Sequence, residues 1–483
     1  MSVMQEARKA HNSTRGVKIL ATIGPSSSSV ETVKDMIKSG VSGFRINMSF
    51  GDAETWSYYL KTIIEASEEL DAVVSIIGDI PGPQVRSGGF SEVQVSRGDA
   101  VYLSRSPGLF PESTEVPVPL KEFYSALEPG DTVLYGDGEV ELRVIEVGRD
   151  FAKCIATGSG TLKPGRKLVV QGKELPLPFL SGKDLELINY ICRNKFTYIA
   201  LSYVRDDQDI LLAKGVLDQY NCRVNILSKI ETPSGVKNVQ KICELSDAVL
   251  IARGDLGVHF PIEDIPIVQE QIARAAVQLG KPVVVATDIL DSMIEGHRPS
   301  RSDVIGVYST VYNLVDAILL TNETAIGKYP VEAVKWARAI SDKALQNMPE
   351  VLVEQLRKLI KSRSLLEKYV HGLISLAESL NGSIIVYTRT GRIAPLVARL
   401  RPKVNTYVGS WNKKLLEKYT IYYGIQPVDI SSEVSEQDDH ERGVKILSMR
   451  VKDKGYLKTG DVVVESYAKP GLNVHEIRVE VLV

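Results

Sequence analysis

Charged and hydroxyl side chains recur at the ends of short apolar segments in this chain of 483 residues. They are Arg45, Asn47 and Ser49 after one segment, Asp79 after the next, and later Lys229 with Glu231, Arg253 with Asp255, and Thr287. Burying such a group costs free energy unless a partner or a ligand compensates it. The repetition therefore indicates one functional site to which several segments contribute.

The types of these residues narrow the chemistry. Glu231 and Asp255 offer the oxygen ligands that Mg²⁺ prefers, and so few protein ligands leave positions for water and substrate. Lys229, Arg45 and Arg86 supply positive charge for an anion. A divalent cation beside such groups neutralises the charge on a transferring phosphoryl group, so we expect phosphoryl chemistry. The sequence has neither GxxxxGK[ST] nor GxGxxG, which excludes phosphate-binding loops of those types.

The apolar segments that must position these residues alternate with amphipathic stretches such as Ser29–Ser39 and Ile265–Leu279. Eight of them have the pattern of buried parallel strands: Val17–Gly24, Val41–Met48, Ala72–Ile80, Thr197–Val204, Arg223–Ile230, Asp247–Gly254, Pro282–Thr287 and Ala317–Asn322. Eight strand–helix units predict an α/β fold of the (β/α)8 TIM barrel type, in which active sites lie at the carboxyl ends of the strands. The pattern alone leaves a doubly wound open sheet as the alternative.

Two regions depart from the strand–helix repeat. One is dense in Gly and Pro and carries alternating strands such as Val140–Val147, which predicts a small β-barrel lid domain inserted in the barrel. The other follows the barrel and predicts a C-terminal α/β domain. The expected domains are the barrel in two parts, residues 1–86 and 183–348, the inserted lid, residues 87–182, and the C-terminal domain, residues 349–483.

Composition limits the partners and the location. Lys and Arg total 58, Asp and Glu total 60, and the formal net charge is -2. This balance argues against nucleic acid and against anionic membrane surfaces, which attract an excess of basic residues. No apolar run approaches the ~18 residues that span a bilayer, and the start lacks the apolar core of a secretory signal. The four cysteines are far apart and form no CxxC, so we expect no disulfide framework, no zinc site and a reduced, cytoplasmic protein.

Seven stretches closely resemble the pyruvate kinase family. They are KILATIGPS (18–26), FRINMSFG (44–51), GDIPGPQVR (78–86), SKIE (228–231), VLIARGDLG (249–257), KPVVVATDILDSM (281–293) and LTNETAIGKYP (320–330). The likeness runs from about Arg15 to the last residue, and the order of ARGDLG after SKIE makes it specific. Family members transfer the phosphoryl group of phosphoenolpyruvate to ADP, giving ATP and the enolate of pyruvate, which is then protonated. The resemblance therefore implies a pyruvate kinase of glycolysis.

The resemblance also implies roles for the residues of the reaction. Glu231 and Asp255 would bind the Mg²⁺ or Mn²⁺ that holds the carboxylate of phosphoenolpyruvate. Lys229 would stabilise the transferring phosphoryl group and the enolate oxygen, and Arg45 would bind the phosphoryl group. Thr287 would lie near the face where the enolate takes its proton.

Other residues are implied to bind the two substrates. The backbone around Arg253, Gly254 and Asp255, at a short helix start, would hold the substrate carboxylate. Arg86 and Lys183 flank the inserted domain at its two hinges, and the equivalent positions in the family contact nucleotide phosphates. The inserted domain would then close as a lid over the site and exclude water.

A monovalent cation site is implied as well, from Asn47, Ser49, Asp79 and the carbonyl group of Ile80. In the family, Glu at position 84 accompanies potassium dependence and Lys accompanies independence. This chain has Gln84, which is neither, so the resemblance leaves dependence on K⁺ open.

The C-terminal domain suggests regulation. Thr388, Arg389, Thr390, Gly391 and Arg392 match the loop in which family members often bind an allosteric phosphate, and hydroxyls, arginines and a helix start suit a phosphorylated effector. A plain polar turn between strand and helix is the alternative. Family members are commonly homotetramers.

Two other functions use part of the same residues. A barrel lyase or mutase could hold phosphoenolpyruvate or pyruvate on Mg²⁺ without a nucleotide, but it would need neither Arg86, Lys183 nor a lid. A non-catalytic scaffold predicts the loss of residues such as Lys229 or Thr287, and both are present.

Overall fold

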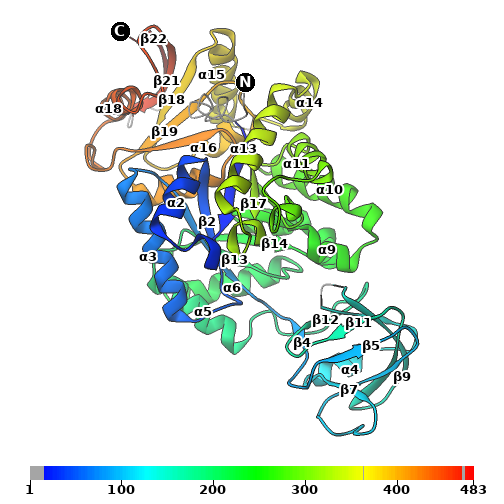
Figure 1. Ribbon diagram of the computed structural model, residues 1–483. Coiled ribbons are helices and arrows are strands. Elements are labelled where there is room, and N and C mark those ends of the chain that lie inside the picture. Colours follow the sequence, from blue (N-terminus) through cyan, green and yellow to red (C-terminus); the bar gives the residue numbers. More distant parts are fainter. Residues whose placement is uncertain (1–15, 137, 363, 470–473, 483) are drawn as a thin grey trace.

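The computed structural model describes residues 16–136, 138–362, 364–469 and 474–482. Eight parallel strands close into a barrel between a separate β domain and a C-terminal domain (Figure 1). Along the chain these strands are β1 (Lys18–Thr22), β2 (Val41–Asn47), β3 (Ser75–Ile80), β13 (Tyr198–Leu201), β14 (Asn225–Ile230), β15 (Ala248–Ala252), β16 (Val283–Ala286) and β17 (Ala317–Leu320). The order around the barrel is β1-β17-β16-β15-β14-β13-β3-β2. The predicted TIM barrel is confirmed, and the open-sheet alternative was wrong.

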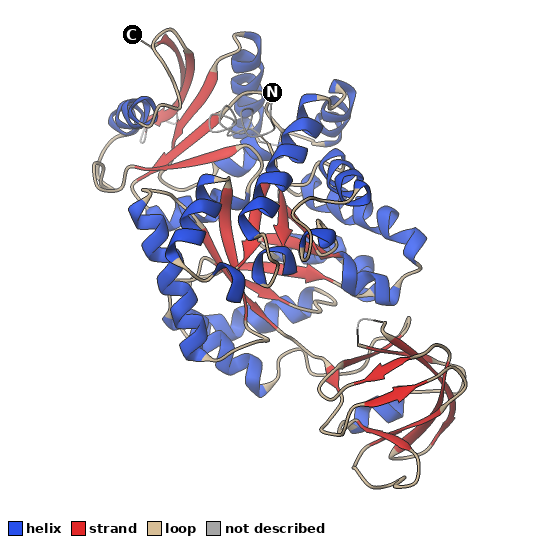
Figure 2. Cartoon of the chain, viewed as in Figure 1, coloured by secondary structure: helices blue, strands red, loops and turns tan. Residues whose placement is uncertain are grey.

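Helices surround the barrel, and short helices follow some strands at its carboxyl end (Figure 2). The longer ones are α2 (Val30–Lys38), α3 (Ala53–Glu69), α5 (Gly182–Arg193), α6 (Asp207–Gln219), α8 (Val239–Leu245), α10 (Ile265–Gln278), α11 (Arg301–Tyr312) and α13 (Pro330–Gln346). The shorter ones are α7 (Pro233–Lys237), α9 (Arg253–His259) and α12 (Asn322–Ala325), with 3-10 turns at Pro25–Ser27, Ile262–Asp264, Asp291–Met293 and Tyr419–Ile421. Side chains of Ser29, Asp52, Ser181 and Ser300 accept from backbone N–H groups at helix starts, as N-caps do.

The inserted domain is built from strands around its own apolar core, as expected (Figure 2). Its elements are β4 (Val85–Arg86), β5 (Val93–Val95), β6 (Ala100–Ser104), β7 (Thr114–Pro117), α4 (Lys121–Ala126), β8 (Thr132–Tyr135), β9 (Val140–Val147), β10 (Phe151–Ala156), β11 (Gly160–Leu162) and β12 (Lys167–Val170). One sheet has the order β4-β12-β8-β9-β10-β6-β7, and β11 pairs with β5 in a second. The pairing of β4 with β12 brings the first and last strands of the insertion together, beside the barrel.

The C-terminal domain packs against the amino-terminal end of the barrel strands. Its elements are α14 (Glu350–Leu359), α15 (Leu365–Ser379), β18 (Ser383–Tyr387), α16 (Ile393–Arg399), β19 (Thr406–Ser410), α17 (Lys413–Lys418), β20 (Ile425–Asp429), α18 (His440–Asp453), β21 (Val462–Lys469) and β22 (Val474–Val481). The sheet order is β20-β19-β18-β21-β22, and β22 runs antiparallel to β21. Arg401 joins the two domains, because its guanidinium donates to both carboxylate oxygens of Asp316 at 2.8 and 2.7 Å.

The expectation that the cysteines form no disulfide was wrong. Cys192, near the end of α5, forms a disulfide with Cys222, which follows α6, and their Cα atoms are 5.2 Å apart. The two residues are 30 positions apart in sequence, and only the packing of neighbouring strand–helix units brings them together. Cys154 and Cys243 are free and buried, and burial raises the pKa of both thiols to about 12. In the described part of the chain, no helix is long and apolar enough to cross a membrane.

Candidate active site

Lys229 lies at the centre of a polar cluster at the carboxyl ends of β3, β13 and β14. Its Nζ is 2.9 Å from Glu231 Oε1 and 3.4 Å from Asp79 Oδ1, and it donates to Ser202 Oγ at 2.8 Å. Burial acts to lower the pKa of Lys229, but the carboxylates of Asp79 and Glu231 raise it above its usual value. The ammonium group therefore stays charged within the barrel rim.

Arg45, on β2, joins the same cluster through Asp79. Its Nε donates to Asp79 Oδ2 at 2.6 Å, and its Nη1 donates to Thr22 Oγ1 at 3.3 Å. The alternation of side chains along β2 directs Arg45 inward. Asp79 thus holds two cations, the Arg45 guanidinium on one carboxylate oxygen and the Lys229 ammonium on the other.

Glu231 and Asp255 follow neighbouring strands, β14 and β15. Burial raises the pKa of Glu231, the Lys229 ammonium opposes this, and the Asp255 charge adds to it. Burial would also raise the pKa of Asp255, but the ammonium groups of Lys167 and Lys229 lower it below its usual value. Glu231 is fully buried, and its Oε1 lies 2.9 Å from the Lys229 ammonium. The direction of this contact is not that of a hydrogen bond.

This carboxylate pair fits a divalent cation. The Glu231 oxygen that faces the Lys229 ammonium has a further lone pair that can bind a metal, and a second carboxylate on the next strand end supplies another ligand. Among the residues that the structure describes, no group of three or more His, Cys, Asp or Glu side chains could hold a metal ion. The donor set therefore suits Mg²⁺ or Mn²⁺ with substrate and water as remaining ligands rather than a closed protein cage.

Three residues of this cluster were not predicted from the sequence. Ser202 and Tyr203 follow β13, and Lys167 comes from the inserted domain. Tyr203 donates its backbone N–H to Glu231 Oε2 at 2.8 Å and its hydroxyl to Asp255 Oδ1 at 3.1 Å. Ser202 and Tyr203 could have been found, since they end a strand as the other site residues do. Lys167 lies in a lid strand, and no sequence signal directs it to the barrel.

Thr287 follows β16, which is separated from the strand of Lys229 only by β15. Its Oγ1 accepts from the backbone N–H of Gly254 at 2.7 Å and donates to Ala286 O at 2.7 Å. Its φ of 66° lies in the left-handed region, which is uncommon for a β-branched residue and marks a fixed backbone. Arg253 directs its side chain to the carbonyl groups of Thr287 and Asp288, so its guanidinium braces this loop.

The residues implied for a monovalent cation lie on β2, β3 and the turn after β2. Asn47 Oδ1 accepts from the backbone N–H of Ser49 at 3.2 Å, and the carbonyl group of Ile80 accepts from Ser202 at 2.8 Å. Asp79 is occupied by Arg45 and Lys229, as described above. Asn47 and Asp79 are paired in register on β2 and β3, and Asn47, Asp79 and the carbonyl group of Ile80 already have protein partners.

The two residues implied for nucleotide phosphates differ in position. Arg86 is exposed on β4, where it pairs in register with Lys167, and it donates to Gly165 O and to Gln84 Oε1. Lys183 is exposed in the first turn of α5. Arg86 therefore has a second lid cation, Lys167, beside it.

Two other polar loops have mainly structural contacts. After β17, Thr324 donates to Thr22 O and Glu323 accepts from Leu290, which closes the barrel rim. In the C-terminal domain, Gly391 donates its N–H to Thr388 Oγ1 and accepts from the hydroxyl of Tyr419. Arg389, Thr390 and Arg392 border this loop at the start of α16 (Ile393–Arg399).

The sequence of this chain is similar to pyruvate kinases over both the barrel and the C-terminal domain. Residues 14–334 match the pyruvate kinase barrel domain, and residues 367–471 match the pyruvate kinase alpha/beta domain. A pyruvate kinase of Aeropyrum pernix is 35% identical over 464 residues, which cover 96% of this chain and 98% of that protein. The pyruvate kinase of Thermotoga maritima is 32% identical, with 95% and 97% covered.

The fold is also similar to solved structures of pyruvate kinases. A pyruvate kinase of Cryptosporidium parvum has a TM-score of 0.89 at 27% identity and covers 97% of each chain. The pyruvate kinase of Pyrobaculum aerophilum has a TM-score of 0.83 at 29% identity, with 97% of this chain and 99% of that chain covered. The ends of β2, β3, β14 and β15 gather an arginine, a lysine and three carboxylates, and the sequence and the fold around them are shared with pyruvate kinases over nearly the whole length. The chain belongs to the pyruvate kinase family.

Proposed function

We propose that the cluster around Lys229 performs the family's reaction, transfer of the phosphoryl group of phosphoenolpyruvate to ADP. The observation that carries this assignment is the position of Lys229 Nζ, buried at the barrel rim between Asp79 and Glu231. Because its pKa is raised, this ammonium keeps a full charge where the phosphoryl group and the enolate oxygen develop negative charge. Such fixed charge lowers the barrier without reorganisation during the reaction.

Glu231 and Asp255 hold the divalent cation in this proposal. When bound, Mg²⁺ or Mn²⁺ supplies positive charge at the oxygens of the substrate. Asp255 reaches it from the start of α9, and Glu231 is fixed by the N–H of Tyr203. With the cation held between them, these two carboxylates would set the position of the substrate carboxylate relative to Lys229.

Arg45 and Thr287 act on the two ends of phosphoenolpyruvate. Arg45 binds the phosphoryl group, since its Nη2 makes no hydrogen bond within the described residues and remains able to donate. Thr287 lies near the face where the enolate is protonated, with water as the carrier. The backbone of Arg253 to Asp255 completes the carboxylate site, although the Gly254 N–H already donates to Thr287.

ADP is placed between barrel and lid. Arg86 and Lys183 are proposed phosphate contacts, and Lys167 is nearer to the candidate metal site than Lys183 because it contacts Asp255. A K⁺ ion would use Asn47, Ser49, Asp79 and the carbonyl group of Ile80.

The remaining proposals concern regulation and assembly. A phosphorylated effector would bind the loop of residues 388–392, a homotetramer is the expected assembly, and the cytoplasm the expected location. The argument for the effector is chemical, because two arginines and two threonines precede the start of α16.

The experiment that tests the proposed site replaces Lys229 by Met. We expect Lys229→Met to reduce turnover in a coupled lactate dehydrogenase assay by about 10²- to 10³-fold, the scale of losing a group that stabilises developing charge. Lys237→Met, an exposed lysine on α7, is the matched control and keeps wild-type turnover. Near wild-type turnover of Lys229→Met, with folding checked by circular dichroism, would remove Lys229 from the reaction.

A further inference from the structure

Lys18 is a buried lysine at the amino-terminal end of the barrel, opposite the candidate active site. It is the first residue of β1, and only 7% of it is exposed. Within the described part of the chain, its Nζ makes no ion pair and no hydrogen bond. Burying a charged ammonium group without a partner costs free energy, so this lysine calls for a physical explanation.

The carboxylate of Asp316 does not serve as a partner of Lys18, although the two residues are neighbours. The backbone N–H of Lys18 donates to the backbone carbonyl of Asp316 at 2.8 Å. The Asp316 carboxylate is already occupied, because Arg401 donates to both of its oxygens and the N–H groups of Val283 and Tyr423 donate to one oxygen each. The Asp316 charge is therefore neutralised by Arg401.

The charged group that acts on Lys18 is a second cation, Arg338 of α13. Its Nη1 donates to the carbonyl group of Val17 at 2.8 Å, which holds the guanidinium beside the start of β1. Its Nη2 lies 2.7 Å from Asp342 Oδ1, without the direction of a hydrogen bond. The Nε is buried and has no hydrogen bond among the described residues, so it can still donate to an anion.

Burial and the Arg338 charge together lower the pKa of Lys18 to about 7. An ordinary lysine has a pKa of about 10.4, so only on the order of one in 10³ is unprotonated near neutral pH. Lys18 is unprotonated far more often than that. A neutral lysine amine is a nucleophile, and desolvation beside another cation is one way in which proteins activate it.

A nucleophilic amine beside a guanidinium with an unused donor suits a modification that turns the amine into an anion. We propose that Lys18 reacts reversibly with carbon dioxide to form a carbamate. The lone pair of Nζ forms a bond to the carbon, the electron pair of one C–O π bond moves to oxygen, and one proton leaves Nζ for water. The product carries one negative charge, and its oxygens accept from Arg338 Nε in a charge-assisted hydrogen bond.

Carbon dioxide fits this place because it is small and uncharged. It enters apolar surroundings without the desolvation cost that an ion meets. A bicarbonate ion held between a protonated Lys18 and Arg338 is the competing interpretation, and it differs in having no covalent bond to Nζ. The carbamate links β1 to α13 at the base of the barrel, and the inference does not depend on the reaction at the other end.

Nuclear magnetic resonance tests for the covalent bond. The full chain, labelled with ¹⁵N only at the lysine side chains, is kept in ¹³C-bicarbonate at about pH 8, above the pKa of Lys18 and below that of an ordinary lysine. We expect one ¹³C resonance that is split by coupling to ¹⁵N and is absent from Lys18→Met. A carbamate on an α-amino group gives no splitting, since that nitrogen is unlabelled. Lys38→Met, an exposed lysine on α2, is the matched control and keeps the split resonance.

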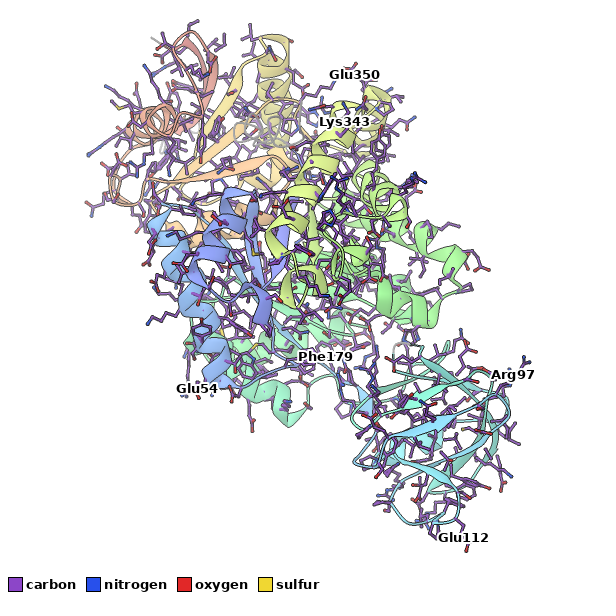
Figure 3. All side chains as sticks on the ribbon, in the orientation of Figure 1. Glu54, Arg97, Glu112, Phe179, Lys343 and Glu350 are labelled. Atoms are coloured by element: carbon purple, nitrogen blue, oxygen red, sulfur yellow. A yellow bond between two sulfur atoms is a disulfide. The ribbon has the colours of Figure 1, made fainter. Side chains whose placement is uncertain are left out.

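A second pair of variants tests the role of Arg338. Arg338→Met should reduce the split resonance about three- to tenfold at the same bicarbonate concentration, the scale of one partly exposed ion pair. Its control is Lys343→Met, an exposed lysine further along α13 that Figure 3 labels, and this variant should match wild type. Circular dichroism checks folding, because Arg338 also donates to Val17. An unchanged resonance in folded Arg338→Met would overturn the pairing of the carbamate with Arg338.

Thermal unfolding gives an independent measurement. Because the carbamate forms on the folded chain, bicarbonate should raise the Tm of wild type relative to buffer free of carbon dioxide at the same pH and ionic strength, and it should leave Lys18→Met unchanged. The absence of a split resonance, or its persistence in Lys18→Met, overturns the carbamate. An unsplit resonance that depends on Lys18 would show bicarbonate held without a covalent bond, which overturns it as well.

Discussion

Arg45 and Asp79 form an ion pair, with Nε and Oδ2 2.6 Å apart, and only 3% of the Asp79 side chain is exposed. The other oxygen of Asp79 lies 3.4 Å from Lys229 Nζ. One carboxylate on β3 therefore holds together two cations that come from strands β2 and β14. The distance between these cations decides whether a phosphoryl group can contact both.

Asp79→Asn should loosen that arrangement. The amide keeps the size of the side chain but removes the charge that offsets Arg45 and Lys229, which then repel each other. We expect kcat to fall by at least about tenfold and the KM for phosphoenolpyruvate to rise, measured in the coupled assay. Asp71→Asn on the barrel surface is the control, and equal kinetics of both variants would show that Asp79 does not position the two cations.

The disulfide between Cys192 and Cys222 should stabilise the protein. It closes a loop of 30 residues, for which loop entropy gives about 3–4 kcal/mol. Cys192→Ser should lower Tm by several degrees in the absence of reductant, and dithiothreitol should bring wild type to the same Tm. In denaturant, a thiol reagent should detect two thiols before reduction and four after it. Four thiols before reduction would show that the bond does not form.

Arg401 should be needed to hold the C-terminal domain on the barrel. It is 2% exposed, its guanidinium donates twice to Asp316, and it lies 4.6 Å from the centre of the Tyr423 ring. Arg401→Met leaves the Asp316 charge buried without this partner, which costs about 3–5 kcal/mol. Calorimetry should show a lower Tm. Arg401→Met together with Asp316→Leu removes both charges, and it should recover part of the loss; no recovery would mean that the shape of Arg401 matters more than its charge.

The barrel and most of its rim could be predicted from the sequence, because each strand is short and apolar and most of the strands end in a polar side chain. The two-residue period alone puts Arg45, Asn47 and Ser49 on one face of their strand, and it puts Lys229 and Glu231 on one face of theirs. The period does not say which residues of a separate domain reach the rim, so Lys167 was missed. It also does not give long-range pairs such as Cys192 with Cys222, which depend on the packing of neighbouring helices.

The same limit applies to charges inside the barrel wall. Lys18, the first residue of β1, fits the apolar strand pattern by position but not by type. The structure buries it, with 7% exposed, and burial together with the charge of Arg338 lowers its pKa to about 7 from an ordinary 10.5. A sequence pattern gives the side of the strand on which Lys18 lies, but not whether a carboxylate lies near it.

Lys18→Met should therefore stabilise the protein in a way that depends on pH. Between pH 7 and 10.5 the unfolded chain binds a proton at Lys18 that the folded chain does not, so wild-type stability rises with pH across this range. The cost is greatest at pH 7 and below, on the order of 4 kcal/mol, and it disappears as the pH approaches 10.5. The Tm of Lys18→Met should exceed that of wild type most at pH 7, and the difference should shrink by pH 10. Lys38→Met, an exposed lysine on α2, should show no such trend. A Tm difference for Lys18→Met that stays constant with pH would mean that Lys18 is protonated in the folded protein and has found a partner.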